Sequence, residues 1–411
     1  MNEDIGKILN SSLEIQLNEL LKLSTQTDSP KNKEHVAAII EKIYINNTSL
    51  SERFSIKTVS NYLIEKIKEI LLNESKGSED AFRINIEKSE IFTKDNTNKI
   101  FNDLLGIKPQ KIKVFSPISG INLEKDVSPF KIGPFEIIKG TDIKQPFVIN
   151  SSLHISVTLH NIYDLDLAIS KANDAFKDFI RLVVFISGSN DKNIEIKVGL
   201  PILTEMGKDI IYRDSESYFI ENEIGEFESF NIKNNIVKNI PIDNEFFFNN
   251  GHFKLLWSLY NTREKKAKKT TMKDRLLNSS LALGQSMNDR DIKNSIIYTC
   301  ISLEILFSFD ENSLFQKSIS DKLADILVFI VATDTQSRIN TSSFIKKFYG
   351  LRSALVHGGN KKTNNDYVAI NILLRSAINE LLNNEKYQHI ENIDMLYSMV
   401  KEAQYSYSHK P

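Results

Sequence analysis

The sequence predicts an α+β protein in three parts: a helical region over residues 1–105, a mixed α/β domain over residues 106–245 and an all-α helical bundle over residues 246–411. Three observations lead to this prediction. Apolar residues recur at helical spacing up to about residue 105. Short alternating segments separated by Gly and Pro follow. The helical spacing then returns near residue 245 and continues almost to the last residue.

Three helices are predicted in the N-terminal region. The first carries an apolar stripe of Leu13, Leu17, Leu20 and Leu21. A polar link over residues 24–32 separates it from a second helix over residues 36–45. The third covers residues 56–72, and its apolar residues recur every four positions at Val59, Leu63, Ile67 and Leu71.

The middle domain combines short strands with one long helix over residues 167–186. The clearest strand covers residues 153–160, where apolar residues alternate with polar ones, so one face is expected to be buried and the other solvated. His154 and His160 lie on its polar face and are expected to contact solvent. The other strands are predicted at residues 111–115, 130–138, 147–149, 194–198, 210–212, 218–220 and 230–237.

The C-terminal part predicts a bundle of about five or six helices. Each helix has apolar residues at spacings of three and four. The helical segments cover residues 272–287, 291–308, 319–332, 344–357, 366–382 and 393–403, and residues 253–260 before them are mostly apolar and aromatic.

Composition narrows the class of protein. The net charge is -1, so nucleic-acid binding would need a local basic patch. The chain has one cysteine, Cys300, which rules out an internal disulfide and suits a reducing compartment. The first residues are polar and acidic, and no apolar segment is long enough to span a bilayer. We therefore expect a cytoplasmic protein without a membrane partner.

Residues 344–360 predict a helix that ends abruptly. Gly358 and Gly359 supply the left-handed conformation that often ends a helix. Arg352 lies near the helix end, and His357 precedes the glycines. Phe344, Phe348, Leu351 and Leu355 would face the core. Gly350, inside the segment, indicates either close approach of another helix or a helix that begins after it.

Arginine and histidine can bind a phosphate and transfer a proton. Five positions along a straight helix correspond to a rotation of about 140° and a rise of about 7.5 Å, so Arg352 and His357 would not share a face. Either the helix loosens at Gly358 or a second copy of the chain completes the site. Two-fold pairing would bring two arginines and two histidines to one seam.

The surrounding residues are basic. Residues 335–365 contain no Asp or Glu, whereas the basic residues are Arg338, Lys346, Lys347, Arg352, Lys361 and Lys362. A positive surface of this kind suits a phosphate backbone. The alternative is that the lysines are ordinary solvated residues and that Arg352 pairs with an acid such as Glu304.

Three segments carry a family resemblance: CISLEILF at residues 300–307, ISDKLA at residues 319–324 and YGLRSALVHGG at residues 349–359. In this order, over residues of about 271–390, the chain resembles the HEPN superfamily, most closely its Apea-like branch. The last segment resembles the family's signature of an arginine and a histidine four to six residues apart. Glu304 stands where this branch commonly has a glutamate. Ser353 stands where many HEPN proteins have Asn, Asp or His.

The resemblance implies a metal-independent endoribonuclease that needs no cofactor and pairs as a homodimer through the bundle. Proteins of this kind often act in antiviral defence, abortive infection and toxin systems, so a phage trigger or regulatory partner is implied. The substrate would be RNA, with tRNA as one candidate. The implied roles are catalytic for Arg352 and His357 and supporting for Glu304 and Ser353. The basic segment adds Lys346, Lys347, Lys361 and Lys362 as candidate RNA-binding residues. The alternative is a non-catalytic HEPN module for dimerisation or for binding RNA or a partner.

Other candidates are weaker. His154 and His160 lie about 20 Å apart along a strand, too far to share one metal ion. Asp164 and Asp166 form too small a pattern to indicate a metal-dependent nuclease. Cys300 lies on an apolar helix face and is expected in the core. The basic residues 263–269 either follow an RNA backbone or form a solvated surface.

Overall fold

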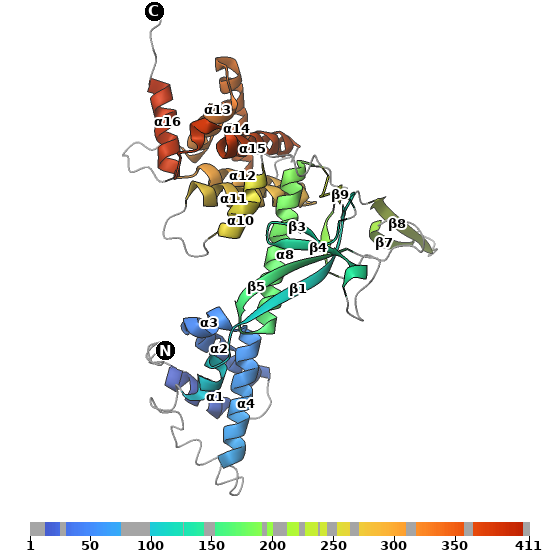
Figure 1. Cartoon of the computed structure of the whole chain (residues 1–411), viewed down its shortest axis with the longest axis vertical. Coiled ribbons are helices and arrows are strands. Elements are labelled where there is room, and N and C mark those ends of the chain that lie inside the picture. Colours follow the sequence, from blue (N-terminus) through green and yellow to red (C-terminus); the bar gives the residue numbers. More distant parts are fainter. Residues whose placement is uncertain are drawn as a thin grey trace, which may run out of the picture. The chain divides into compact units, whose positions relative to one another are not determined.

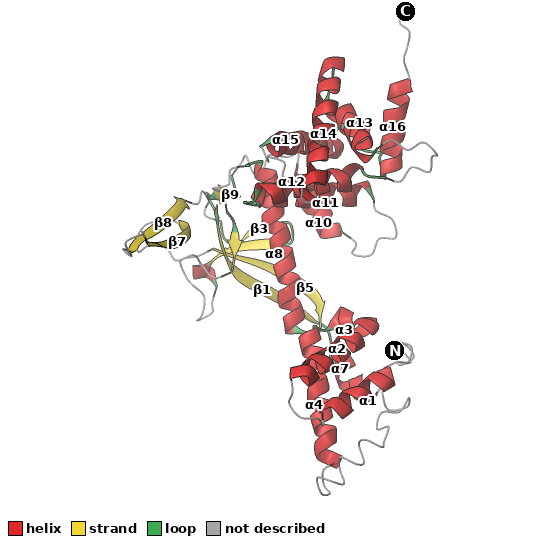
Figure 2. Cartoon of the chain, turned by 180° about the vertical axis from the view of Figure 1, so that it is seen from behind, coloured by secondary structure: helices red, strands yellow, loops and turns green. Residues whose placement is uncertain are grey.

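The computed structural model describes residues 13–24, 30–74, 99–125, 127–143, 153–190, 195–199, 212–221, 227–236, 239–244, 253–263, 271–309, 318–356 and 365–405. These residues are mostly helical and include a small antiparallel sheet, which confirms the α+β class (Figure 2). The chain divides into two compact units. The first comprises residues 1–114 and 158–174, and the second comprises residues 115–157 and 175–411. The division at residues 105 and 245 stays a prediction.

The first unit contains the three helices predicted near the N-terminus. The predicted stripes are buried in one apolar core, except that the side chain of Leu71 lies outside the described residues. The second helix begins at Pro30 rather than at residue 36, because proline suits the first helical turn, where its missing N–H is not needed. The helices are α1 (Leu13–Ser24), α2 (Pro30–Asn46), α3 (Thr48–Arg53), α4 (Ile56–Glu74), η2 (Lys99–Phe101) and α7 (Asn102–Leu105).

Two aspartates of the first unit have structural partners. The Asp164 carboxylate accepts backbone N–H groups from Ser55 at 2.6 Å and from Asp166 at 2.9 Å. Asp166 forms an ion pair of 3.1 Å with Lys57. Asp164 therefore holds the chain at the start of α4, which explains this acidic pair without a metal.

The main sheet has the strand order β3 (Phe130–Ile132), β4 (Phe135–Lys139), β5 (Leu153–Ile162), β1 (Gln110–Ser119) and β6 (Lys197–Val198). Phe130 pairs with Ile137 in one hairpin, and Phe135 pairs with Val157 on the next strand. The predicted strand at residues 147–149 lies outside the described residues. The strands are β1 (Gln110–Ser119), β2 (Ile121–Asn122), β3 (Phe130–Ile132), β4 (Phe135–Lys139), β5 (Leu153–Ile162), β6 (Lys197–Val198), β7 (Tyr212–Glu221), β8 (Phe227–Ile236) and β9 (Ile240–Pro241), and the short η3 (Gly140–Asp142) follows β4.

Strand β5 corrects one prediction. His154 is 3% exposed and Ser156 is fully buried, whereas His160 is exposed. The alternating pattern assumed that one face of this strand meets solvent. Residues 154–157 of β5 are buried without a break, so the first half of the strand is covered on both faces and only the second half reaches solvent.

Helix α8 (Leu165–Ser187) confirms the long helix predicted over residues 167–186. Its inward residues are all buried, as expected for Ala168, Ala172, Phe176, Phe179 and Leu182. Like β1 and β5, it has residues in both units.

The second unit also contains the C-terminal bundle (Figure 1). Polar caps define several helix starts: Thr271 and Asp274 form a capping box, Asp291 accepts the Lys293 N–H, and Ser318 accepts the Asp321 N–H. The helices are α10 (Lys254–Thr262), α11 (Met272–Asn288), α12 (Ile292–Phe307), α13 (Ile319–Val331), α14 (Thr335–Val356), α15 (Asp366–Asn383) and α16 (Ile393–Tyr405), with a short η5 (Glu385–Tyr387).

Small polar residues line the contact between α11 and α12. The hydroxyl oxygens of Ser279 and Ser302 lie 2.8 Å apart, and those of Ser286 and Thr299 also lie 2.8 Å apart. Thr299 donates a further bond of 2.7 Å to Asn371 on α15. These bonds satisfy buried polar groups while small side chains let the helices pack closely.

Helix α14 differs from the prediction at its start. It begins at Thr335, not near Phe344, and continues through Gly350. Phe348 is buried as expected, but Phe344 is only partly buried. A Cβ atom at Gly350 would meet nothing within 4 Å. Within the described part of this chain, neither close approach of a helix nor a helix start explains Gly350.

Candidate functional site

Arg352 lies in the final part of α14 and contacts Glu304 of α12. Its Nη2 atom is 3.3 Å from Glu304 Oε1 and 3.5 Å from Oε2. The Arg352 side chain is 34% exposed, so the guanidinium meets both protein and solvent. Its Nε atom is buried and has no hydrogen-bond partner among the described residues. The arginine is therefore held by one nitrogen and keeps further donors.

Tyr349 completes this cluster. Its hydroxyl donates a bond of 2.5 Å to Glu304 Oε1, and the Arg352 guanidinium lies 5.7 Å from the centre of its ring. Burial and the adjacent Glu304 carboxylate raise the pKa of Tyr349, so its hydroxyl stays a donor. Tyr349 was not predicted as part of the site. The available signal was spacing, because positions 349 and 352 lie on one helix face.

Cys300 lies one helical turn before Glu304 and is fully buried, as expected for a core residue. Burial, with a smaller effect of the Glu304 charge, raises the pKa of its thiol to about 12. A thiol of this kind is neutral at physiological pH and is unsuited to act as a nucleophile.

Several predicted site residues lie outside the described residues: His357, Lys361 and Lys362. The described helix ends at Val356, directly before His357 in the sequence. Whether His357 approaches Arg352 therefore stays a prediction.

The remaining predicted residues of α14 lie at its surface. Ser353 and Lys347 are exposed, and neither has a described bond to the Glu304 cluster. Lys346 forms an ion pair of 2.7 Å with Asp321 of α13. Part of the positive charge on this helix is thus compensated by a neighbouring helix.

A groove of about 1190 Å³ opens beside this cluster, and Glu304 forms part of its wall. Arg181 of α8 and Arg263, which follows α10, lie in the same groove. Of the predicted basic residues 263–269, only Arg263 is described. Arg181 was not predicted, because it lies on an ordinary amphipathic helix, and Gln285 of α11, to which its Nε donates, is 104 positions away in the sequence.

Two further features, metal-binding side chains and membrane-spanning helices, were compared with the described residues. Among the described residues, no group of three or more His, Cys, Asp or Glu side chains could hold a metal ion. No helix in the described part of the chain is long and apolar enough to cross a membrane.

Comparison with protein-family models, with curated proteins and with solved structures gives no match for this chain. The resemblance to HEPN proteins accordingly rests on the sequence segments alone.

Proposed function

We propose that the C-terminal bundle carries a metal-independent endoribonuclease site of the HEPN type, in which Arg352 and His357 perform the chemistry. The protein would act in the cytoplasm as a homodimer, in antiviral defence or growth arrest, after a phage trigger or a regulatory partner releases its activity. RNA is the proposed substrate, and tRNA is one candidate.

The proposed chemistry uses a nucleophile that RNA itself supplies. The 2′-oxygen attacks the adjacent phosphorus as the bond from phosphorus to the 5′-oxygen breaks. His357 takes the proton of the 2′-hydroxyl, or it protonates the leaving 5′-oxygen. Arg352 binds the phosphate oxygens and stabilises the charge that develops on them. The products are a 2′,3′-cyclic phosphate and a 5′-hydroxyl, and DNA is excluded because it lacks the 2′-hydroxyl.

One observation carries the proposal: Glu304 and Tyr349 position the Arg352 guanidinium without using all of its donors. The contact with Glu304 is made through Nη2 at 3.3 Å, longer than the 2.7–2.9 Å typical of charge-assisted bonds. The buried Nε has no partner among the described residues. Because Nε is buried, a phosphate oxygen would approach the exposed part of the side chain, which is 34% exposed, while Glu304 keeps its contact with Nη2.

The second candidate is a non-catalytic HEPN module that dimerises or binds RNA or a protein partner. It is favoured by the same ion pair, because a carboxylate on a guanidinium neutralises the charge that phosphate would need. In this case Glu304 and Arg352 join α12 to α14 and have no further role.

RNA cleavage by the purified full-length protein separates the two candidates. Labelled total RNA and labelled tRNA are incubated with wild type, Arg352→Ala and His357→Ala, each with and without EDTA. Arg290→Ala and His160→Ala are matched controls, since both residues are exposed and lie outside the Glu304 cluster and the basic residues 335–365. We expect wild type and controls to cleave in EDTA, and the two site variants to lose cleavage.

Equal cleavage by wild type and His357→Ala would exclude the proposed mechanism. If purified wild type does not cleave RNA because its trigger is missing, expression in cells tests the activity instead. There, wild-type toxicity should be relieved by either site variant. If no variant cleaves RNA in vitro and all strains grow equally, the ribonuclease proposal is contradicted and the non-catalytic module is the remaining candidate.

A further inference from the structure

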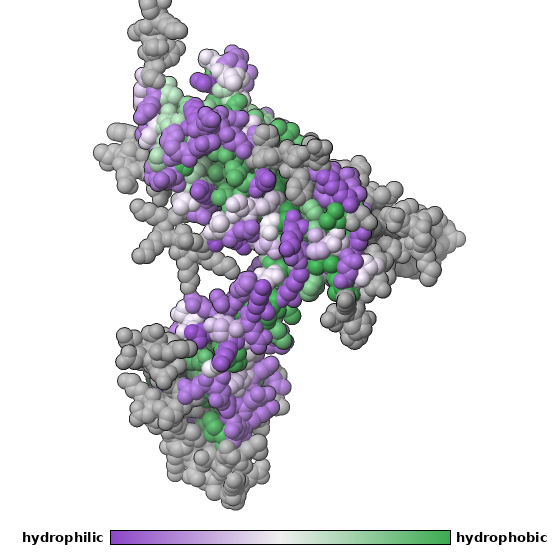
Figure 3. Space-filling model, viewed as in Figure 1, coloured by the Kyte–Doolittle hydropathy of each residue, from purple (hydrophilic) through white to green (hydrophobic). Residues whose placement is uncertain are grey.

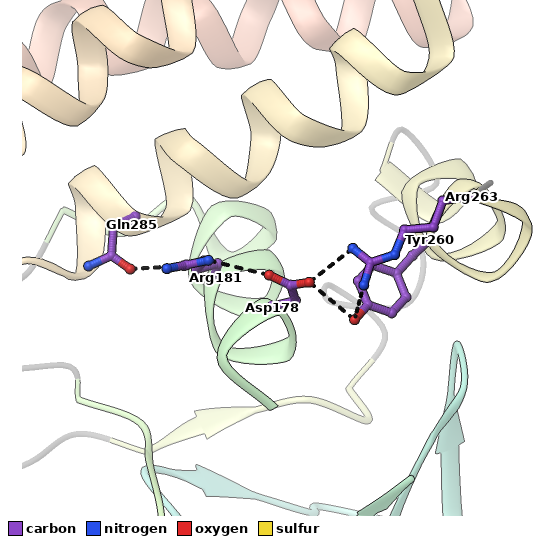
Figure 4. Close-up of polar contacts among 5 residues, drawn as sticks. All are labelled: Asp178, Arg181, Tyr260, Arg263 and Gln285. Atoms are coloured by element: carbon purple, nitrogen blue, oxygen red, sulfur yellow. Dashed lines mark hydrogen bonds and ion pairs between the residues drawn. The ribbon is translucent and has the colours of Figure 1, made fainter. Parts of the chain in front are cut away.

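The groove beside Glu304 contains a cluster in which two arginines share one acid. The Asp178 carboxylate of α8 contacts Arg181 Nη1 at 3.3 Å through Oδ1 and Arg263 Nη1 at 3.0 Å through Oδ2. Tyr260 donates its hydroxyl to the same Oδ2 at 3.2 Å. Figure 4 shows these residues in one chain of contacts that ends at Gln285 of α11. Two positive charges face one negative charge, so the cluster carries a surplus of one positive charge.

Packing between helices fixes this cluster in place. A Cβ atom at Gly284 would lie 2.0 Å from the backbone oxygen of Arg181, so α8 and α11 touch at that point. Arg181 Nε then donates to Gln285 Oε1 at 2.9 Å. On the other side, the Arg263 guanidinium lies 4.1 Å from the centre of the Tyr260 ring. Both guanidiniums are pre-organised, and their side chains are 33% and 32% exposed.

The other charged residues of the groove have compensating partners. Glu304 holds Arg352, as described above. Arg275 donates to the backbone oxygens of Ile305 and Ser308, both at 2.8 Å, and it interacts with Asp394. The uncompensated charge therefore lies at Arg181 and Arg263. One singly charged phosphodiester matches that surplus.

The groove wall formed by α12 contributes an aromatic side chain. Tyr298 of α12 lines the groove and is partly exposed. Apolar residues of the same wall, such as Ile301 and Ile305, are also partly exposed. Figure 3 shows apolar surface next to strongly hydrophilic surface on the bundle. Arginines for phosphates and an aromatic ring for a base are the groups that bind single-stranded nucleic acids.

We propose that this groove binds a single-stranded segment of RNA, with one phosphate on Arg181 and Arg263 and a base stacked on Tyr298. This inference rests on the proposed function and adds the form of its substrate. Glu304 belongs to the lining of the groove and also contacts Arg352, which is not a lining residue, so Glu304 is the residue that the groove shares with the proposed cleavage site. A duplex is not bound in this way, because its bases are not free to stack on a side chain.

RNA binding by the full-length His357→Ala protein, which keeps the substrate intact, tests the groove. Fluorescence anisotropy measures the Kd of a labelled unstructured RNA at several salt concentrations. Arg263→Gln should raise the Kd about tenfold, because a charge-assisted hydrogen bond is lost. It should also lower the slope of log K against log salt by about 0.7, the value for one phosphate contact on a single strand. Tyr298→Ala should weaken binding and leave the salt slope unchanged.

Arg290→Gln is the matched control, since Arg290 also forms an ion pair, at 2.6 Å with Glu195, but does not line the groove. Thermal melting verifies that each variant is folded, and Arg263→Lys keeps the charge if the glutamine variant unfolds. Equal effects of the Arg263 and Arg290 substitutions would overturn the proposal. So would equal affinity for duplex RNA, no RNA binding, or displacement of RNA by an equal concentration of AMP or inorganic phosphate.

Cleavage assays keep this inference separate from the proposed function. If wild type binds RNA in the groove but never cleaves it, the groove proposal is supported and the ribonuclease proposal is contradicted. If cleavage depends on His357 but is unaffected by groove substitutions, the ribonuclease proposal is supported and the groove proposal is contradicted.

Discussion

Glu304 is the residue on which the candidate site depends, because its carboxylate holds two side chains of α14. Tyr349 lies at 2.5 Å from Oε1, and Arg352 lies at 3.3 Å from the same atom. The tyrosine hydroxyl thus makes the closer bond and fixes the direction of the carboxylate. Arg352 is left with a looser contact, which suits a residue that must also bind a phosphate.

The raised pKa of the Cys300 thiol reflects the tight packing of α12 one turn before Glu304. Because its pKa is raised from 9.0 to about 12, the thiol is neutral in the folded protein at pH values where the unfolded chain would ionise it. This group stabilises the fold fully below pH 9.0, and its contribution is lost as the pH rises toward about 12. Since it is the only cysteine of the chain, iodoacetamide labelling measures it alone.

We expect labelling at pH 9.0 to be slow in the native protein and fast after addition of denaturant. The denaturant midpoint for labelling should coincide with the midpoint measured by circular dichroism. Rapid labelling of the native protein would show that the thiol is accessible and ionised, and would contradict the packing of α12.

At the scale of elements, α14 shows what the sequence could and could not predict. Its end was predicted from the glycines at positions 358 and 359, and the described helix reaches Val356. Its start was missed because residues 335–343 have little apolar periodicity. The start depends instead on Asp334, whose Oδ1 accepts the Ser337 N–H at 2.9 Å. Hydrogen bonds from Ser337 lower the pKa of Asp334, as expected for a helix cap.

Contacts between elements were predictable only where both contacting residues belong to recognisable sequence segments. The pairing of Glu304 with Arg352 was an open alternative, since both residues belong to recognisable segments. The cluster of Asp178, Arg181 and Arg263 was not, because it joins helices that are distant in sequence and have no motif. The burial of His154 was not predicted either, because the periodicity of a strand does not show which other element covers its second face.

Two glycines in helices of the second unit should respond oppositely to the same substitution. Gly284→Ala places a methyl group 2.0 Å from the Arg181 backbone oxygen, so we expect a loss of about 1–3 kcal/mol in the free energy of unfolding. The added methyl group of Gly350→Ala meets no atom of the described residues within 4 Å, and the substitution removes a poor helix former, so we expect a gain of about 0.5–1 kcal/mol. Chemical denaturation of the two variants measures both values. A loss at Gly350 would instead indicate that another copy of the chain, or a segment outside the described residues, packs against this position.

At the scale of the whole molecule, charge is distributed unevenly along a nearly neutral chain. The net charge of -1 does not favour RNA, whereas residues 335–365 contain only basic charges. The second unit adds the surplus charge at Arg181 and Arg263. RNA affinity should therefore arise from the second unit rather than from the protein as a whole, and it should decrease steeply with salt.

The helix geometry leads to a prediction about the proposed dimer. Because α14 is helical through Val356, Arg352 and His357 start from different faces unless the chain turns after that residue. We therefore expect the arginine of one copy to act with the histidine of the other. Mixing Arg352→Ala with His357→Ala should then restore activity that neither variant has alone. With random pairing, half of the dimers are mixed and one of their two sites is intact, so about a quarter of wild-type activity is expected.

Native mass spectrometry of the mixture, with one variant carrying an isotope label, verifies that mixed dimers form. Each variant is also mixed with wild type, which measures how far an inactive copy affects its partner. If mixed dimers form and the mixture stays inactive, Arg352 and His357 must act within one chain. The chain would then have to turn after Val356 to bring His357 back toward Glu304, and the second copy would contribute no residue to the site.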